Sequence, residues 1–252
     1  MESPGCSIEI GEFDLADCES IRNFSKAMLD QDRRIDVLCN NAGVMACPKM
    51  RTKDGFEMQL GVNHLGHFLL TNMLMPLLQN TARETNDVRI INVASAAHIP
   101  GRIDFDDLQY ETREYKRWEA YSQSKLANVI FSYELAKRLG STGISSNALH
   151  PGVVATELGR YLFPSTSSSN ENTGPFWAAP LIFVLKQFLL TPEEGARTSI
   201  YLASDDKVRG VTGKYYDSCK PIESNRESYD TDISAKLWDV SAELVKIDKI
   251  YV

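Results

Sequence analysis

Apolar and polar residues follow a pattern along this chain that is typical of strands alternating with helices. Short runs rich in β-branched residues predict strands, and longer segments with apolar residues three and four positions apart predict helices. The expected strands are 8–15, 35–39, 88–93, 144–149 and 213–216, and the expected helices are 20–29, 55–78, 120–139 and 233–247. This order predicts a parallel sheet covered by helices on both faces, with the carboxyl ends of the strands meeting at one edge.

The segment around Thr191 carries the signals of a helix start. Thr191 suits the N-cap, Pro192 suits the first turn, and Glu194 stands where a capping carboxylate is expected. We therefore expect a helix over about 191–202.

Length and charge narrow the class of protein. A chain of 252 residues is long enough for one large α/β core and short for two, so we expect a single domain. The net charge of −7 and the scattered basic residues would repel phosphate backbones, so nucleic acid is not an expected partner.

Cysteine and histidine spacing does not predict a metal site. The five cysteines are Cys6, Cys18, Cys39, Cys47 and Cys219, and they form no CxxC pair. The four histidines are His64, His67, His98 and His150, and no carboxylate stands at ligand spacing beside them. We expect reduced thiols, no metal, and structural or supporting roles for the histidines.

The longest apolar segment, 176–190, is interrupted by Pro180, Lys186 and Gln187. It falls short of the roughly 20 residues that a spanning helix needs. It therefore predicts an apolar lid over a pocket, within 157–190. Peripheral membrane contact through 176–190 is the alternative.

Tyr121 and Lys125 stand four positions apart in a predicted helix, which places them on one helix face. A nearby ammonium stabilises a phenolate, so we expect the pKa of Tyr121 to lie below its reference value of about 10. Tyr121 could then donate or accept a proton. The alternative for this pair alone is a solvated helix face.

Further candidate residues follow the predicted strands. Ser95 comes directly after the strand 88–93, where its hydroxyl could hydrogen-bond a substrate carbonyl oxygen or simply close a turn. Asn40-Asn41-Ala42-Gly43 follows the strand 35–39, and its asparagine amides could bind a ligand or tie strands together. A turn, 150–156, follows the strand 144–149 and ends in a hydroxyl at Thr156.

The NNAG run, the serine after a strand, the YxxxK pair and the PGxxxT turn, in this order and spacing, resemble the short-chain dehydrogenase/reductase family. The segments 41–45, 52–56, 61–68 and 92–98 look most like the branch that contains retinol dehydrogenases, WW-domain oxidoreductases and plant chloroplast-envelope dehydrogenases. The resemblance extends from about residue 8 to residue 245.

The resemblance implies a role for each matching residue. Tyr121 would be the general acid and base, Lys125 would hold the nicotinamide ribose, and Ser95 would orient the carbonyl group. Asn63 matches the fourth catalytic residue, which implies a water-linked proton path to the lysine. Asp14 matches the acidic residue that meets the adenine ring. The other matches to cofactor contacts are Asn41, Ala42, Gly43, Val154 and Thr156.

The sequence departs from the family pattern at its start. The family pattern opens with a strand, a TGxxxGxG turn, a helix, a second strand and a second helix, and none of these precedes residue 8 here. The glycine turn normally supplies the amides that bind the pyrophosphate. We therefore expect a Rossmann-like doubly wound parallel sheet that is N-terminally truncated, and a partial domain over 1–252.

The resemblance implies an oxidoreductase that uses NADP(H), or NAD, on an alcohol/carbonyl pair. The lid composition favours an apolar retinoid-, steroid- or lipid-like substrate, and family members commonly pair as homodimers. A catalytically inactive binding protein is the alternative function, and a sugar-nucleotide epimerase ranks below it. No signal or transit peptide is recognised, so a cytoplasmic location is expected, with a plastid or membrane association open for a longer parent.

Overall fold

The computed structural model describes residues 7–152 and 190–247, and they form an α/β structure around a five-stranded sheet. The strands are β1 (Val37–Asn40), β2 (Val88–Val93), β3 (Ile144–His150), β4 (Tyr215–Asp217) and β5 (Lys220–Ile222). They lie side by side in chain order; β1 to β4 are parallel and β5 is antiparallel to β4. The predicted parallel α/β architecture is confirmed.

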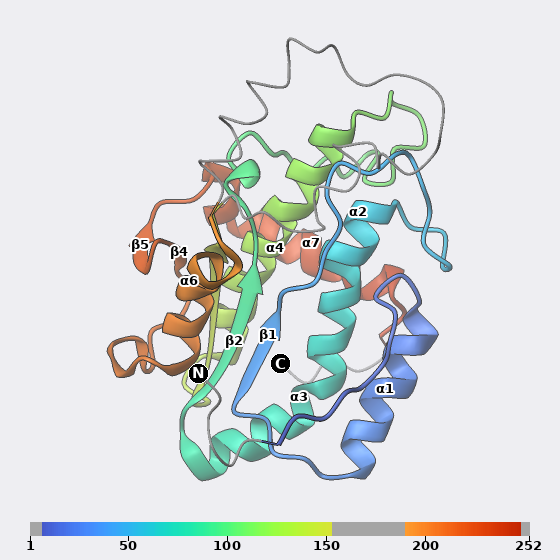
Figure 1. Cartoon of the computed structure of the whole chain (residues 1–252). Helices are drawn as coiled ribbons and strands as arrows, with labels where there is room; N and C mark the ends of the chain where they lie inside the picture. The colour runs from blue at the N-terminus through green and yellow to red at the C-terminus, as the bar shows by residue number, and fades with distance from the viewer. Residues whose placement is uncertain (1–6, 153–189, 248–252) are drawn as a thin grey trace, which may run out of the picture.

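Helices cover both faces of this sheet (Figure 1). They are α1 (Cys18–Asp30), α2 (Met58–Leu60), a π-helical turn (Gly61–Leu65), α3 (Gly66–Thr85), α4 (Arg117–Leu139), α6 (Pro192–Ser204) and α7 (Thr231–Leu244). Short 3-10 helices occur at Ala96–His98, Asp206–Val208 and Arg226–Tyr229. Neighbouring residues of a strand point to opposite faces of the sheet, which explains the two helical layers. In β2, Ile90 packs with α3 and α4, whereas Ile91 packs with Leu202 of α6.

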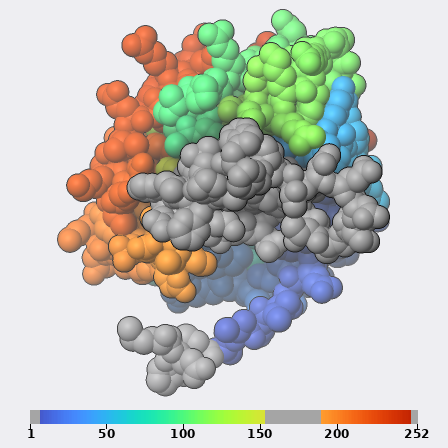
Figure 2. Space-filling view, turned by 45° about the horizontal axis from the view of Figure 1, so that its top comes forward, coloured from blue at the N-terminus to red at the C-terminus, as the bar shows by residue number. Residues whose placement is uncertain are grey.

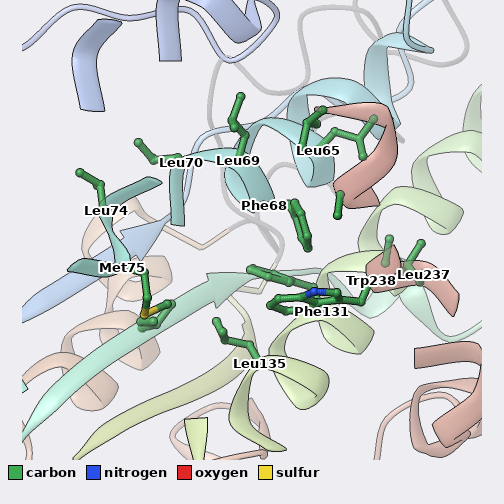
Figure 3. Close-up of a cluster of buried hydrophobic side chains, with 14 of the residues drawn as sticks. Leu65, Phe68, Leu69, Leu70, Leu74, Met75, Phe131, Leu135, Leu237 and Trp238 are labelled. Carbon is green, nitrogen blue, oxygen red and sulfur yellow. The ribbon is translucent and has the colours of Figure 1, made fainter. Parts of the chain in front are cut away.

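The largest core lies where α3, α4 and α7 meet (Figure 3). Phe68 of α3 lies 5.4 Å from Phe131 of α4 and 4.9 Å from Trp238 of α7, measured between ring centroids. The Arg138 guanidinium sits 4.4 Å from the Trp238 ring centroid. These contacts fix α7 across the outer face of α3 and α4.

The predicted helix start at Thr191 is confirmed in detail. The Thr191 side chain accepts a hydrogen bond from the Glu194 amide at 3.2 Å, and the Glu194 carboxylate accepts one from the Thr191 amide at 2.9 Å. Two otherwise unpaired amides are thereby satisfied, and α6 begins at Pro192.

The predicted strand at 8–15 is wrong. Residues 7–14 form no strand, and Ile8 and Ile10 are each 90% exposed. A strand needs the hydrogen bonds of a neighbour, and among the described residues none lies beside this segment. Near its end the backbone turns into α1 instead, where the Asp14 amide donates to Ser20 Oγ.

The predicted lid, 157–190, lies outside the described residues except for Leu190. Within the described part of the chain, no helix combines the length and apolar character that crossing a bilayer would require.

Candidate active site

Tyr121 and Lys125 lie one turn apart in α4, and the structure brings them together as the spacing predicts. Lys125 Nζ lies 5.8 Å from the centroid of the Tyr121 ring. The two side chains are buried, and the Lys125 ammonium donates a hydrogen bond to the Val93 carbonyl at 3.1 Å. This hydrogen bond attaches the Lys125 side chain to the carboxyl end of β2.

The protonation of this pair differs from the expectation. Burial raises the pKa of Tyr121, although a side-chain hydrogen bond with Ser95 lowers it. Burial also lowers the pKa of Lys125 to about 8. Desolvation therefore outweighs the effect of Ser95, and the expected depression of the Tyr121 pKa is wrong for the side chains as they stand.

Ser95 lies two residues after the end of β2, at the carboxyl edge of the sheet. Its side chain is the N-cap of the 3-10 helix Ala96–His98 and accepts a hydrogen bond from the Ala97 amide at 3.2 Å. It also lies close enough to Tyr121 to lower the pKa of that phenol. Two hydroxyls from different elements therefore point to one place, where a substrate oxygen could meet both.

Asn63 stands in the π-helical turn that precedes α3. Its side chain accepts from the Val44 amide at 2.8 Å and donates to the Val44 carbonyl and to Ser124 Oγ, both at 2.9 Å. This residue therefore connects the segment after β1 to the helix that carries Tyr121. π-helical turns often occur at functional sites.

Gly43 brings the backbone close to this cluster. A Cβ atom at Gly43 would lie 2.7 Å from Asn63 Oδ1 and 3.6 Å from Lys125 Nζ. A larger residue would displace the Asn63 side chain, so the close approach requires glycine. Asn41 and Ala42 precede it and are exposed.

Asn40 ties the strands rather than facing the site. Its amide donates to Thr71 Oγ1 at 3.0 Å and to Asn92 Oδ1 at 2.8 Å. Asn92 in turn donates to Ser146 Oγ at 3.3 Å. This buried network joins β1, β2, β3 and α3. Tying strands together was one of the two roles expected for the asparagine amides.

One predicted cofactor contact, Asp14, is not joined to this cluster, and two others lie outside the described residues. Asp14 lies in the turn before α1, where its carboxylate accepts from the Ala16 amide at 2.8 Å. Val154 and Thr156 lie outside the described residues. No group of three or more histidine, cysteine or acidic side chains within 7–152 and 190–247 is arranged to hold a metal ion.

Sequence reasoning missed Asn225, and for His98 it expected a structural or supporting role without naming its partners. Asn225 donates to three carbonyl groups in the segment after Ser95, and His98 contacts both Ser95 and Asn225. The two residues stand 127 positions apart, so local patterns could not reveal their contact.

Comparisons with known proteins show what this chain is similar to. The family model described as short chain dehydrogenase matches residues 2–166. Human retinol dehydrogenase 13 is 46% identical over 237 residues, which cover 93% of this chain and 68% of that protein.

Two solved structures are similar in fold. A crystal structure of an uncharacterized protein from Mycobacterium Paratuberculosis has a TM-score of 0.69 and 35% identity, over 94% of this chain and 75% of that one. The Pseudomonas aeruginosa RhlG/NADP active-site complex has a TM-score of 0.57 and 26% identity, over 81% of this chain and 72% of that one.

Proposed function

We propose, from the premise that this chain belongs to the short chain dehydrogenase family, that it interconverts an apolar alcohol and its carbonyl compound with NADP(H). The chain is accordingly an NAD(P)-dependent oxidoreductase. One observation carries the proposal: Ser95, Tyr121 and Lys125 converge at the carboxyl end of β2, where open α/β sheets bind their ligands.

The two hydroxyls have distinct tasks in this proposal. In the reducing direction the Tyr121 hydroxyl gives its proton to the carbonyl oxygen, and in the oxidising direction it takes the proton back. The Ser95 hydroxyl hydrogen-bonds the same oxygen and holds it against Tyr121. The raised pKa of Tyr121 keeps the phenol protonated, which suits the donor role in reduction.

The residues around Lys125 fit a nicotinamide cofactor. Among the described residues the Lys125 ammonium donates one hydrogen bond, to the Val93 carbonyl, and an ammonium has three donors. The others remain for the hydroxyl groups of a ribose, and Gly43 leaves room for close approach beside them. A bound nicotinamide would supply or accept the hydride, while Lys125 positions the ribose and favours the phenolate that forms on Tyr121.

The preference for NADP(H) over NAD(H) is supported by similarity. The Pseudomonas aeruginosa neighbour is described as an NADP complex. The resemblance to the retinol-dehydrogenase branch favours the same cofactor.

The choice of an apolar substrate is supported by side chains near the site. Trp118 is 50% exposed, and its ring centroid lies 5.9 Å from that of Tyr121. Ile99 is also exposed, four residues after Ser95. Figure 2 shows green residues of this part of the chain exposed along the upper part of the view. Large exposed apolar side chains beside a polar centre favour a ligand with apolar bulk.

A homodimer through α3 and α4 would have to accommodate α7. Trp238 of α7 packs against Phe68 and Phe131, and Ser241 hydrogen-bonds His64 Nε2 at 2.8 Å. This face is therefore already covered within one chain. If the protein forms a homodimer as family members commonly do, we propose that α7 forms part of the interface.

The proposal is tested by assaying the purified protein with NADPH and NADH against all-trans-retinal, a steroid ketone and a short aldehyde. We expect turnover with NADPH, with the highest kcat/KM for the larger apolar substrates. A thermal shift titration with each cofactor gives the matching binding result, because a ligand that binds the folded state raises Tm. A protein that showed neither cofactor binding nor turnover would overturn the proposal. That result would favour the inactive binding protein.

A further inference from the structure

The segment 95–101 joins Ser95 to a set of contacts that the proposed reaction does not explain. Its last residue, Gly101, is buried against α4: a Cβ atom there would lie 2.6 Å from the carbonyl oxygen of Ser122. Ser122 directly follows Tyr121. The segment that starts at one active-site hydroxyl therefore ends against the backbone beside the other.

Asn225 holds this segment from the C-terminal part of the chain. Its side-chain amide donates to the carbonyl groups of His98 at 3.2 Å, Ile99 at 2.7 Å and Gly101 at 3.0 Å. Its backbone amide lies 3.2 Å from His98 Nε2. One residue thus contacts three carbonyl groups at and beyond the end of the 3-10 helix, which leaves the segment little freedom to move.

The partners of His98 fix its tautomer. A backbone amide can only donate, so Asn225 N donates to Nε2, and the proton of the neutral ring must sit on Nδ1. Nδ1 lies 2.7 Å from the Ser95 carbonyl, which can only accept. The ring is fully buried and its centroid lies 4.5 Å from that of Tyr215 of β4, with the two rings tilted, so it cannot easily rotate.

The segment around Asn225 is itself attached to the helix of Tyr121. Tyr133 of α4 hydrogen-bonds Ser224 Oγ at 2.9 Å, and Ser224 Oγ contacts Ser228 Oγ at 2.7 Å. The Glu227 carboxylate accepts from the Ile103 amide at 3.1 Å. The contacts therefore run from α4 through 224–228 to the segment after Ser95.

We propose that His98 and Asn225 are positioning residues that hold the Ser95 hydroxyl beside Tyr121, with His98 acting in its neutral Nδ1-protonated form. The inference rests on the proposed function, because Ser95 matters to turnover only if it holds the substrate oxygen. Protonation of Nε2 would place an N–H against the Asn225 amide and break the link. The titratable groups that face His98 are His150 at the end of β3 and Tyr215 on β4.

The first test uses Asn225→Ser, with Asn147→Ser as the matched control. Serine keeps an oxygen for the cap on the Glu227 amide, from which Asn225 Oδ1 now accepts at 2.8 Å, and removes the side-chain nitrogen that makes the three contacts. Asn147 pins another loop to the sheet, through the Val211 carbonyl and the Lys214 amide. Both variants lose stability through lost hydrogen bonds.

We expect Asn225→Ser to lower kcat by about tenfold or more, because small misplacement of a reacting group is costly, and to leave the KM for NADPH unchanged. Asn147→Ser should keep the wild-type kcat at a similar Tm. Equal kcat values for the two variants would overturn the inference.

The second test separates the two nitrogens of His98. In His98→Asn the side-chain amide occupies the place of Nδ1 and can still donate to the Ser95 carbonyl, whereas in His98→Gln it occupies the place of Nε2. We expect His98→Asn to retain more of the wild-type kcat than His98→Gln. We also expect the wild-type kcat to fall at acidic pH and His98→Asn to lack this part of the profile. The reverse order of the two variants, or an identical acid limb in all three proteins, would contradict the inference.

The rate of amide hydrogen exchange in residues 95–101 tests the same contacts without an activity assay. We expect faster exchange there in Asn225→Ser than in Asn147→Ser. Faster exchange without turnover in the wild type would leave the contacts correct and the proposed function wrong. Unchanged exchange in both variants would overturn the positioning role itself.

Discussion

The centre of the sheet and its β1 edge are built in different ways. Every residue of β2 and the first six residues of β3 are buried, and the buried asparagine network ties these strands together. In β1, by contrast, Val37 and Cys39 are exposed, and Ile8 and Ile10 before it are almost fully exposed. Both regions are apolar in sequence, so apolar content alone does not decide which one is packed.

The difference matters because the candidate chemistry is attached to the centre. Ser95 follows β2, and Lys125 is bonded to the last residue of β2. The helix that carries Tyr121 is contacted by the segment after Ser95 and by the C-terminal part of the chain. The geometry of the Ser95, Tyr121 and Lys125 cluster therefore depends on the centre and little on the exposed edge.

The largest expected effect comes from removing one oxygen at the centre. Tyr121→Phe should lower kcat by about a thousandfold, because the proton donor is lost, while the ring and the fold remain. Steady-state kinetics and a thermal melt measure the two results. Val37→Ala at the edge is the control and should keep full turnover; a Tyr121→Phe protein as active as the wild type would remove Tyr121 from the reaction.

The next effect compares packing in the two regions directly. Ile90→Ala in β2 should lower the free energy of unfolding by about 2–5 kcal/mol, because it leaves a cavity in the main core. Val37→Ala in β1 should cost less than about 1 kcal/mol, since the side chain is already 38% exposed. Urea denaturation measures both. Equal losses would mean that the edge is covered by something that packs as tightly as the core.

A smaller loss is expected where the segment after β1 joins the centre. Asn63→Ala removes the bonds to both backbone groups of Val44 and should cost about 1–3 kcal/mol in unfolding free energy. Asn80→Ala, on the exposed face of α3, is the matched control and should be nearly neutral. If the two variants were equally stable, the Asn63 contacts would contribute nothing to the fold.

A further effect, seen as a slope with pH rather than as a single loss, belongs to the buried lysine. Burial lowers the pKa of Lys125 to about 8 from 10.5, so the unfolded chain binds more protons between these values. The contribution of Lys125 to stability therefore rises as pH increases from about 8 towards 10, and is flat below 8. Lys125→Met should lack this rise in urea denaturation series. The same slope in both proteins would mean that the ammonium is not buried.

The central elements could be predicted from the sequence because their signals are local. The apolar runs that became β2 and β3 and the capping residues at Thr191 each determine structure within a few positions. Tyr121, Lys125 and Ser95 were also found this way, since each is marked by its place after a strand or on a helix face.

The elements that escaped prediction depend on distant partners or unusual turns. The segment 8–15 has the composition of a strand but no neighbour among the described residues to pair with. The β4–β5 hairpin turns through Ser218 and Cys219, whose φ angles are 50° and 61°, without the Asn-Gly signal typical of such turns. The contacts of Asn225 join positions more than 120 residues apart, which no local pattern can show.

Transfer of deuterium from NADPH labelled at the hydride position to an apolar aldehyde tests the central claim most directly. We predict that the wild-type protein places deuterium on the carbinol carbon of the alcohol product, detected by mass spectrometry, and that Tyr121→Phe does so at least about a hundredfold more slowly. Unlabelled alcohol, or equal labelling rates in the two proteins, would contradict the claim that Ser95, Tyr121 and Lys125 form a hydride-transfer site.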